Sequence, residues 1–321
     1  MITVRVTAPA ALADDVRTVL MAEPGLSSLT VQPSESPVGT CFTANIPREH
    51  ANRMVEALHA LGVQEEGTIQ LIPAGTWISQ RAYEADIAAP GAASDAVVWA
   101  DVIERAYQET ALTWMYLSFM VLATLLAAIA VITDSTVLLI GAMVLGPEFV
   151  AVAALGLALV RRRRRLFVQS VRTLAIGFAV SILVTTAVVA ILRAFHLVTI
   201  NDVSAPHGAT DFIASPNIWS LLVAFLAGVA GVLAITSARG GGLVGVFISV
   251  TTIPASGYIA VSVVFARWEP ALGSLEQLII NIAGMAVAGW ITLALQQRIY
   301  ARIPALRVPA SVRARGRRAQ R

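Results

Sequence analysis

A proline and a glutamate lie side by side in an apolar stretch that is long enough to cross a bilayer. The run "IGAMVLGPEFVAVAALG", residues 140–156, is apolar except for Glu148, which directly follows Pro147. Proline removes a backbone donor and displaces the carbonyl four residues earlier, so a helix opens at that point. An ionised side chain at the bilayer centre is costly and usually faces protein or water. This pair predicts a backbone opening in which Glu148 binds an ion or a proton.

A second stretch has the same construction. The run "GLVGVFISVTTIPASGYIAVSVV" opens with an apolar-glycine step and then reaches Pro254 among serines and threonines. Proline-interrupted spans at matching places in two halves of a chain are the sequence sign of a midplane binding site in secondary transporters. The predicted ion- or solute-binding residues are Gly146, Pro147, Glu148, Thr251, Thr252, Pro254, Ser256 and Asn281, with Ser249 close by.

The same residues also allow a structural interpretation. Prolines often kink packed membrane helices without forming a binding site. Glu148 would then hydrogen-bond across helices or to a neighbouring subunit. The sequence leaves both interpretations open.

Composition and hydropathy predict a polytopic membrane protein. Of 321 residues, 57% are hydrophobic and 13% are charged, and the mean hydropathy is +0.74. Such values lie outside those of ordinary soluble domains. Runs close to the ~20 residues needed to cross a bilayer occur at 113–132, 137–160, 171–195, 218–236, 243–266 and 278–296. We therefore expect six transmembrane helices, arranged as an inverted repeat of three plus three, because three spans bring the chain to the opposite side.

Arginines predict the orientation. With the amino terminus inside, fifteen arginines lie on the cytoplasmic side: "RRRRR" at 161–165, Arg172, Arg239 and eight between Arg298 and Arg321. Only Arg193 and Arg267 fall near outside ends. This excess predicts both termini in the cytoplasm of a multi-pass protein of the cell inner (plasma) membrane. The five-arginine run could instead be a regulatory contact for anionic lipid headgroups. The first residues, "MITVRVTAPA", do not have the pattern of a secretory signal peptide.

The amino-terminal region has a different pattern. Strand-like segments at 2–7, 26–33, 39–46 and 67–72 alternate with amphipathic helices around Leu12–Leu20 and Ala51–Leu61. The order βαββαβ predicts a ferredoxin-like α+β domain over 1–80, which would be a ligand sensor, an oligomerisation module or a plain packing domain. A linker and a polar helix follow at 81–109, then the six-span domain at 110–298 and a basic cytoplasmic tail at 299–321.

Several kinds of chemistry find little support. Cys41 is the single cysteine and the four histidines are scattered, so no metal-ligand spacing is present. The three glycines of "TSARGGGLVG" lack the Lys-Ser/Thr ending of a phosphate loop. The spans contain no set of nucleophile, base and orienting residue. We therefore expect no enzyme activity, no cofactor and no nucleic-acid partner.

The hairpin "ITDSTVLLIGAMVLGPEF" and the later "ITSARGGGLVGVFISVTTIPASG" resemble the bacterial and archaeal membrane family called domain of unknown function 389. Gly141, Ala142, Met143 and Pro147 match the first part of its pattern, and Gly245, Val246 and Pro254 match the second. The resemblance covers about residues 108–296. Glu148, Phe149 and Val150 depart from the run that follows the first proline in many members. The resemblance implies a membrane fold and no activity.

Three functions are consistent with the sequence. The leading one is a secondary transporter or facilitator of a small ion or polar solute, with the two triplets moving about the broken helices. The second is a channel-like pore gated by the amino-terminal domain. The third is a membrane-anchored sensor or assembly scaffold that transports nothing. We also expect contact with membrane lipid and a homo-oligomer, most simply a dimer.

Overall fold

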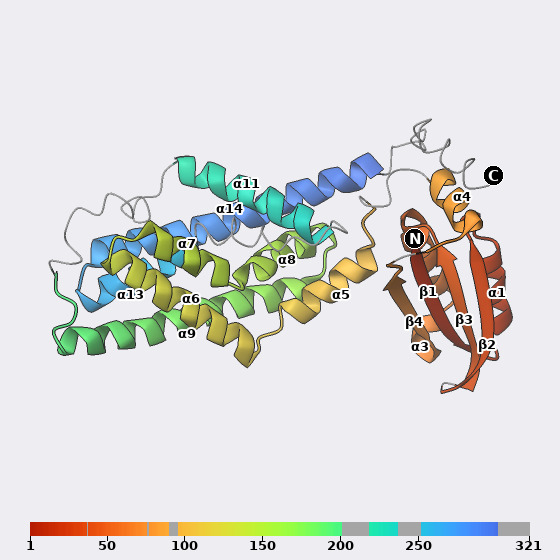
Figure 1. The fold of residues 1–321 in the computed structure, drawn as a ribbon, viewed down its shortest axis with the longest axis horizontal. Helices are drawn as coiled ribbons and strands as arrows, with labels where there is room; N and C mark the ends of the chain where they lie inside the picture. Colours follow the sequence, from red (N-terminus) through yellow and green to blue (C-terminus); the bar gives the residue numbers. More distant parts are fainter. Residues whose placement is uncertain (37, 76, 90–95, 201–217, 237–251, 301–321) are drawn as a thin grey trace. The chain divides into compact units, whose positions relative to one another are not determined.

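The structure is a computed structural model, and it describes residues 1–36, 38–75, 77–89, 96–200, 218–236 and 252–300 (Figure 1). The chain divides into two compact units. The amino-terminal unit is built mainly from Met1–Ile103, and the helical unit from Glu104–Ile235 and Arg239–Arg298. The division falls inside helix α5, Trp99–Glu109, which ends the stretch predicted at 81–109 as a linker and a polar helix.

The amino-terminal unit is a four-stranded antiparallel sheet with helices. Its strands are β1 Ile2–Pro9, β2 Ser28–Glu35, β3 Val38–Ile46 and β4 Thr68–Pro73, in the order β2-β3-β1-β4. Its helices are α1 Ala13–Met21, a single 3-10 turn η1 at Arg48–His50, α2 Ala51–Ala60, α3 Val63–Glu66 and α4 Gln80–Ala88. The predicted βαββαβ order is present, and α4 lies in the stretch predicted as a linker. This strand order is that of a ferredoxin-like split unit.

The core of this unit follows the alternation of the strands. Val4 and Val6 of β1 pair in register with Ala44 and Phe42 of β3, and all four side chains are buried. Val98, just before α5, belongs to the same core. The side-chain amide of Asn52 fixes this segment by donating to the Val97 carbonyl (2.7 Å) and accepting from the Trp99 N–H (3.0 Å).

The helical unit contains seven named helices within the described residues. They are α6 Trp114–Ile132, α7 Thr136–Leu145, α8 Glu148–Val160, α9 Arg164–Ala194, α11 Ile218–Thr236, α13 Ile253–Val264 and α14 Trp268–Tyr300. Four of them, α6, α9, α11 and α14, are long and apolar enough to cross a membrane, and α7 with α8 forms a fifth candidate bent by 56°. The chain is therefore a membrane protein.

The predicted count of six spans depends on residues 243–266, of which the structure describes only the last part. There, α13 is 12 residues long, or about 18 Å at 1.5 Å per residue, which is shorter than the ~30 Å hydrocarbon layer. Elsewhere α6 and α11 agree closely with the predicted ranges, whereas α9 and α14 begin seven and ten residues earlier.

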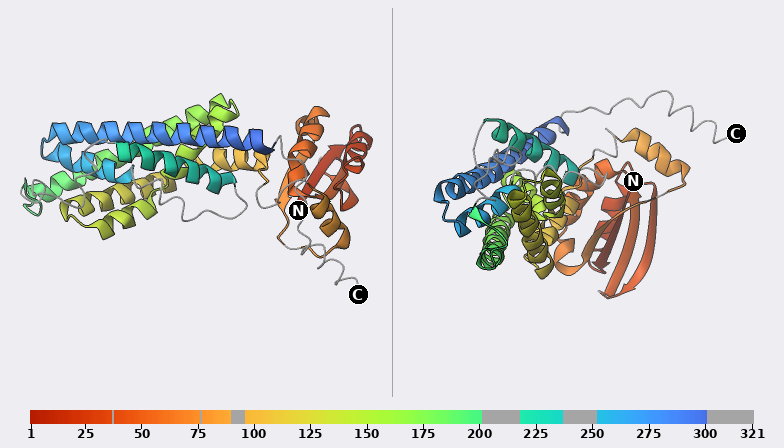
Figure 2. Two further views of the ribbon diagram at one scale, coloured as in Figure 1. Left: turned by 90° about the horizontal axis from the view of Figure 1, so that it is seen from above. Right: turned by 60° about the vertical axis from the view of Figure 1, so that its left-hand side comes forward.

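The helices run in two opposed sets. Helices α6, α9 and α13 run in one direction, and α7–α8, α11 and α14 run in the other (Figure 1). Helices α11 and α14 lie side by side in every view (Figure 2). A Cβ on Gly289 of α14 would lie 2.8 Å from Val232, and one on Gly228 of α11 would lie 2.5 Å from the Met285 carbonyl oxygen. Small residues therefore allow the two backbones to approach closely.

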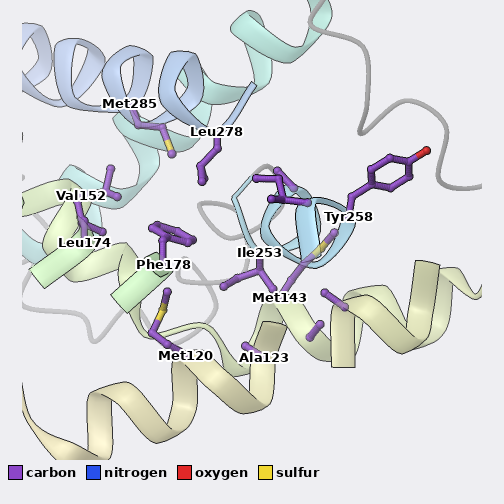
Figure 3. Packing of buried hydrophobic residues seen from close by; sticks show 14 of the residues in the cluster. Met120, Ala123, Met143, Val152, Leu174, Phe178, Ile253, Tyr258, Leu278 and Met285 are labelled. Carbon is purple, nitrogen blue, oxygen red and sulfur yellow. The ribbon is translucent and has the colours of Figure 1, made fainter. Parts of the chain in front are cut away.

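The two short helices α8 and α13 are the most buried elements of this unit. Ten of the thirteen residues of α8 and ten of the twelve of α13 are buried, whereas the long helices bury only 28–44% of their most apolar stretch. Met120 of α6, Met143 of α7, Phe178 of α9 and Ile253 of α13 face a common apolar core (Figure 3). The long helices thus enclose the short ones and present apolar side chains outward.

Candidate functional site

The first break lies where the sequence places Gly146 and Pro147. Helix α7 ends at Leu145, and Gly146 has an extended ψ of 120°. A residue that precedes proline is forced toward this extended region by the proline ring. Helix α8 then begins at Glu148, with Pro147 as its N-cap residue. The Gly146–Pro147 step therefore accounts for the 56° bend between α7 and α8.

Pro254 lies at the start of a helix. Thr252 is the N-cap residue of α13, and Pro254 falls in its first turn. Proline is well tolerated there because the N–H it lacks would have no partner within the helix. The sequence predicted Pro254 as an interruption within a span; in the structure it lies in the first turn of α13, and residues 237–251 lie outside the described residues. Thr251 and Ser249 lie outside the described residues.

The two helix starts meet in the interior of the helical unit. The Thr252 hydroxyl donates a 2.7 Å hydrogen bond to Oε1 of Glu148, and both residues are fully buried. The two residues are 104 positions apart in the chain. Thr252, as an N-cap residue, makes no side-chain cap of its own helix, so its hydroxyl is committed to the carboxylate.

A second buried hydroxyl pair lies one turn further along α13. Ser256 donates to the Ile253 carbonyl at 2.7 Å, and its oxygen lies 3.1 Å from Oγ1 of Thr124 on α6. Because a serine hydroxyl has one proton, Thr124 is the donor of the second bond. Thr124 was missed by the sequence analysis, since a lone threonine in an apolar run has no proline or glycine beside it to signal a site.

Two further polar residues complete the description. Asn281 is fully buried on α14, and its described hydrogen bond is with Gln277 of the same helix, at 3.5 Å. The structure therefore brings together Glu148, Thr252 and Ser256, and adds Thr124. Tyr116 of α6, also missed, is buried and lies close enough to Glu148 for the two groups to interact electrostatically.

Comparison with known families gives a match in the helical unit. The family model described as Domain of unknown function (DUF389) matches residues 143–287. The chain is a DUF389 family protein. The matched region begins in α7 and includes both helix starts with Glu148, Thr252 and Ser256. No curated protein and no solved structure matches the chain.

The chemistry available to this DUF389 domain centres on one carboxyl group. Among the described residues of the helical unit, every other buried polar side chain carries a hydroxyl or an amide group, so Glu148 is the buried side chain that can carry a charge. Its place in the first turn of α8 favours negative charge, because the helix N–H groups point toward it. No group of three or more His, Cys, Asp or Glu side chains suited to a metal ion is present in the described residues.

Proposed function

We propose that the DUF389 domain of this protein is a secondary transporter or facilitator of a small ion or polar solute, with its site where α8 and α13 begin. The observation that carries the proposal is the buried 2.7 Å hydrogen bond from Thr252 to Glu148. A carboxylate enclosed by apolar helices is costly, and here it lies at the break between the two helices of the bent span. A buried ionisable group at a backbone break is the arrangement that ion and proton pathways use.

The helix lengths support an inverted repeat. Helices α6 and α11 have 19 residues each, α8 and α13 have 13 and 12, and α9 and α14 have 31 and 33. Corresponding helices run in opposite directions (Figure 1). We therefore infer two triplets, α6 to α9 and α11 to α14, each with a short central helix that begins near the middle of the bundle. The chain would have six spans if α13, together with the residues before it, forms the fifth span.

Proton exchange at Glu148 fits the geometry. A hydroxyl group both donates and accepts hydrogen bonds. When Glu148 is ionised, Thr252 donates to it; when Glu148 carries a proton, the carboxyl donates and Thr252 accepts after its hydroxyl rotates. The pair therefore remains bonded in both protonation states. Transport would follow from relative movement of the two triplets about their short helices, and it requires no catalytic step.

The test is flux through the purified chain in vesicles. Proteoliposomes that contain the pH dye pyranine are exposed in turn to gradients of Na⁺, K⁺, chloride and inorganic phosphate. We expect a saturable flux of at least one of these ions, with a proton signal that Glu148→Gln abolishes. Glu269→Gln, which removes an exposed carboxyl group near the start of α14, is the matched control and should leave the flux unchanged.

Other outcomes identify the alternatives. An ohmic current with weak saturation would favour a channel-like pore gated by the amino-terminal unit. No flux of any tested ion, with a folded protein, would favour a membrane-anchored sensor or scaffold. Unchanged flux in Glu148→Gln would remove Glu148 from the mechanism.

We also infer the plasma (inner) membrane as the location, with both termini in the cytoplasm. The edge strands β2 and β4 each have one unpaired side within the described sheet, and such edges can pair with a second copy. A homo-oligomer, most simply a dimer, is therefore part of the proposal. Mass photometry of the purified chain would measure the number of subunits.

A further inference from the structure

A strongly basic turn joins α8 to α9. Helix α8 ends with the Arg162 N–H bonded to the Leu159 carbonyl and the Arg163 N–H bonded to the Ala158 carbonyl. Arg162 itself has a positive φ of 51°. Helix α9 then begins at Arg164. This hydrogen-bonded turn presents consecutive arginines in a fixed backbone conformation.

The arginines of this turn are exposed to solvent. Arg162, Arg163, Arg164 and Arg165 are all exposed to solvent. The ion pairs found in the described part of the chain involve none of these four. Four adjacent like charges repel one another, so the turn would gain stability from an anion.

Apolar side chains border the turn on both helices. Leu159 at the end of α8 is 42% exposed, and Phe167, Val168 and Val171 at the start of α9 are 38%, 55% and 43% exposed. Large apolar residues rarely remain in water beside a cluster of charges without a reason. An apolar band that meets a basic band is the profile of a surface at the boundary between acyl chains and headgroups.

We propose that the basic turn, Arg162–Arg165, binds the headgroups of anionic phospholipids while Leu159, Phe167, Val168 and Val171 contact their acyl chains. The planar guanidinium group forms paired hydrogen bonds with phosphate oxygens, and basic side chains next to a span attract anionic lipid. A free phosphate ion would pair only with the arginines, whereas a phospholipid would pair with the arginines through its headgroup and cover the apolar side chains with its acyl chains. The site is separate from Glu148 and does not depend on transport.

Native mass spectrometry of the full-length chain in detergent tests this proposal. Phosphatidylglycerol and phosphatidylcholine are added in turn at equal concentration, and the bound lipids are counted. We expect phosphatidylglycerol to be retained, and Arg162→Gln with Arg163→Gln to weaken its binding by about thirtyfold. The same positions changed to lysine keep the charge and should retain most of the binding. Arg5→Gln with Arg17→Gln, which removes two exposed arginines of the amino-terminal unit, should retain all of it.

Three results would overturn the proposal. The first is equal retention of phosphatidylcholine and phosphatidylglycerol by the unaltered chain. The second is full displacement of phosphatidylglycerol by inorganic phosphate or a short oligonucleotide, which would identify a general anion surface. The third is unchanged binding of phosphatidylglycerol by the variant with Arg162→Gln and Arg163→Gln. This variant keeps Arg161, Arg164 and Arg165, so it retains most of the positive charge that orients the span in the membrane.

Discussion

Thr252 and Glu148 join the starts of two short helices through a hydrogen bond of 2.7 Å that spans 104 positions of the chain. Hydrogen bonds to charged groups contribute about 1.5–3 kcal/mol. Thr252→Val keeps the shape of the side chain and removes the donor. We expect it to lower the free energy of unfolding by about 2 kcal/mol, measured by denaturant titration in detergent, and to alter the pH dependence of any flux.

The matched control is Thr252→Ser, which keeps the hydroxyl and should retain both stability and pH dependence. A double-mutant cycle with Glu148→Leu isolates the pair, because leucine cannot accept the hydrogen bond, whereas glutamine could. If Thr252→Val costs as much in the Glu148→Leu background as in the unaltered chain, the hydrogen bond does not link these two residues in the functional protein.

Gly257 of α13 is packed against the backbone of α6. A Cβ at this position would lie 2.7 Å from Cβ of Ala127 and 2.8 Å from the backbone nitrogen of Ala128. Because neither atom belongs to a flexible side chain, we expect Gly257→Ala to destabilise the protein by about 1–3 kcal/mol, seen as a lower thermal midpoint in detergent. Gly141→Ala is the control, since its Cβ would meet only Leu126 at an ordinary 3.5 Å. Equal midpoints for the two variants would contradict this contact.

In the described part of the chain, four helices are followed by a residue other than glycine in the left-handed conformation. These residues are Asp134, Arg162, His196 and Ala266, after α6, α8, α9 and α13. Glycine adopts positive φ without the steric cost that a Cβ brings. We therefore expect Ala266→Gly to raise the free energy of unfolding by about 0.5–1 kcal/mol. Ala190→Gly, in the interior of α9, should lower it by about 1 kcal/mol. The same sign of change for both variants would contradict the assigned backbone conformation.

The sequence predicted the apolar helices well. Runs of apolar residues predict the part of a helix that is buried or covered by lipid, and the predicted ranges of α6 and α11 agree with the structure almost to the residue. Pro147 and Pro254 looked alike in the sequence, and each lies at the start of a short helix, Pro147 as the N-cap residue of α8 and Pro254 in the first turn of α13. Proline is tolerated at a helix start because the N–H it lacks would have no partner within the helix.

The starts of α9 and α14 were predicted too late for a related reason. Hydropathy detects the lipid-covered part of a helix, whereas arginine and glutamate continue a helix well beyond it. Arg164 and Arg165 therefore extend α9, and Glu269 with Pro270 forms a favourable first turn for α14. The sequence predicted Glu148 and Thr252 as members of one site. It did not predict Thr124, because the contact of Thr124 depends on which face of α6 points inward, and a nearly uniform apolar run does not reveal that face.

Glu49 in η1 provides a pH test of the amino-terminal unit. Burial has the largest effect on the pKa of this carboxyl group and raises it. A backbone hydrogen bond lowers it by less, the Asp86 carboxylate raises it by less again, and the positive charges of the amino terminus and Arg48 lower it least. A raised pKa in the folded state means that the stability from this group is present at low pH and is lost as pH rises through the folded value. At neutral pH Glu49→Gln should therefore slow hydrogen exchange in β1 and β3, measured on the full-length chain. Glu56→Gln, at an exposed position of α2, should cause little change, and faster exchange in Glu49→Gln would contradict the expected sign.

Cys41 offers a direct measure of orientation, because it is the single cysteine of the chain and is a free, half-buried thiol on β3. With the amino-terminal unit in the cytoplasm, a membrane-impermeant maleimide should label Cys41 in inside-out vesicles and after detergent treatment, but not in intact cells. In the Cys41→Ser background, Leu197→Cys places a thiol at a 70% exposed position after α9, which is the third span along the chain. This thiol should be labelled in intact cells and should be protected in sealed inside-out vesicles. Labelling of both positions from the same side would require an even number of membrane crossings between them. The inverted arrangement of the two triplets would then be wrong, even if the hydrogen bond between Thr252 and Glu148 is present.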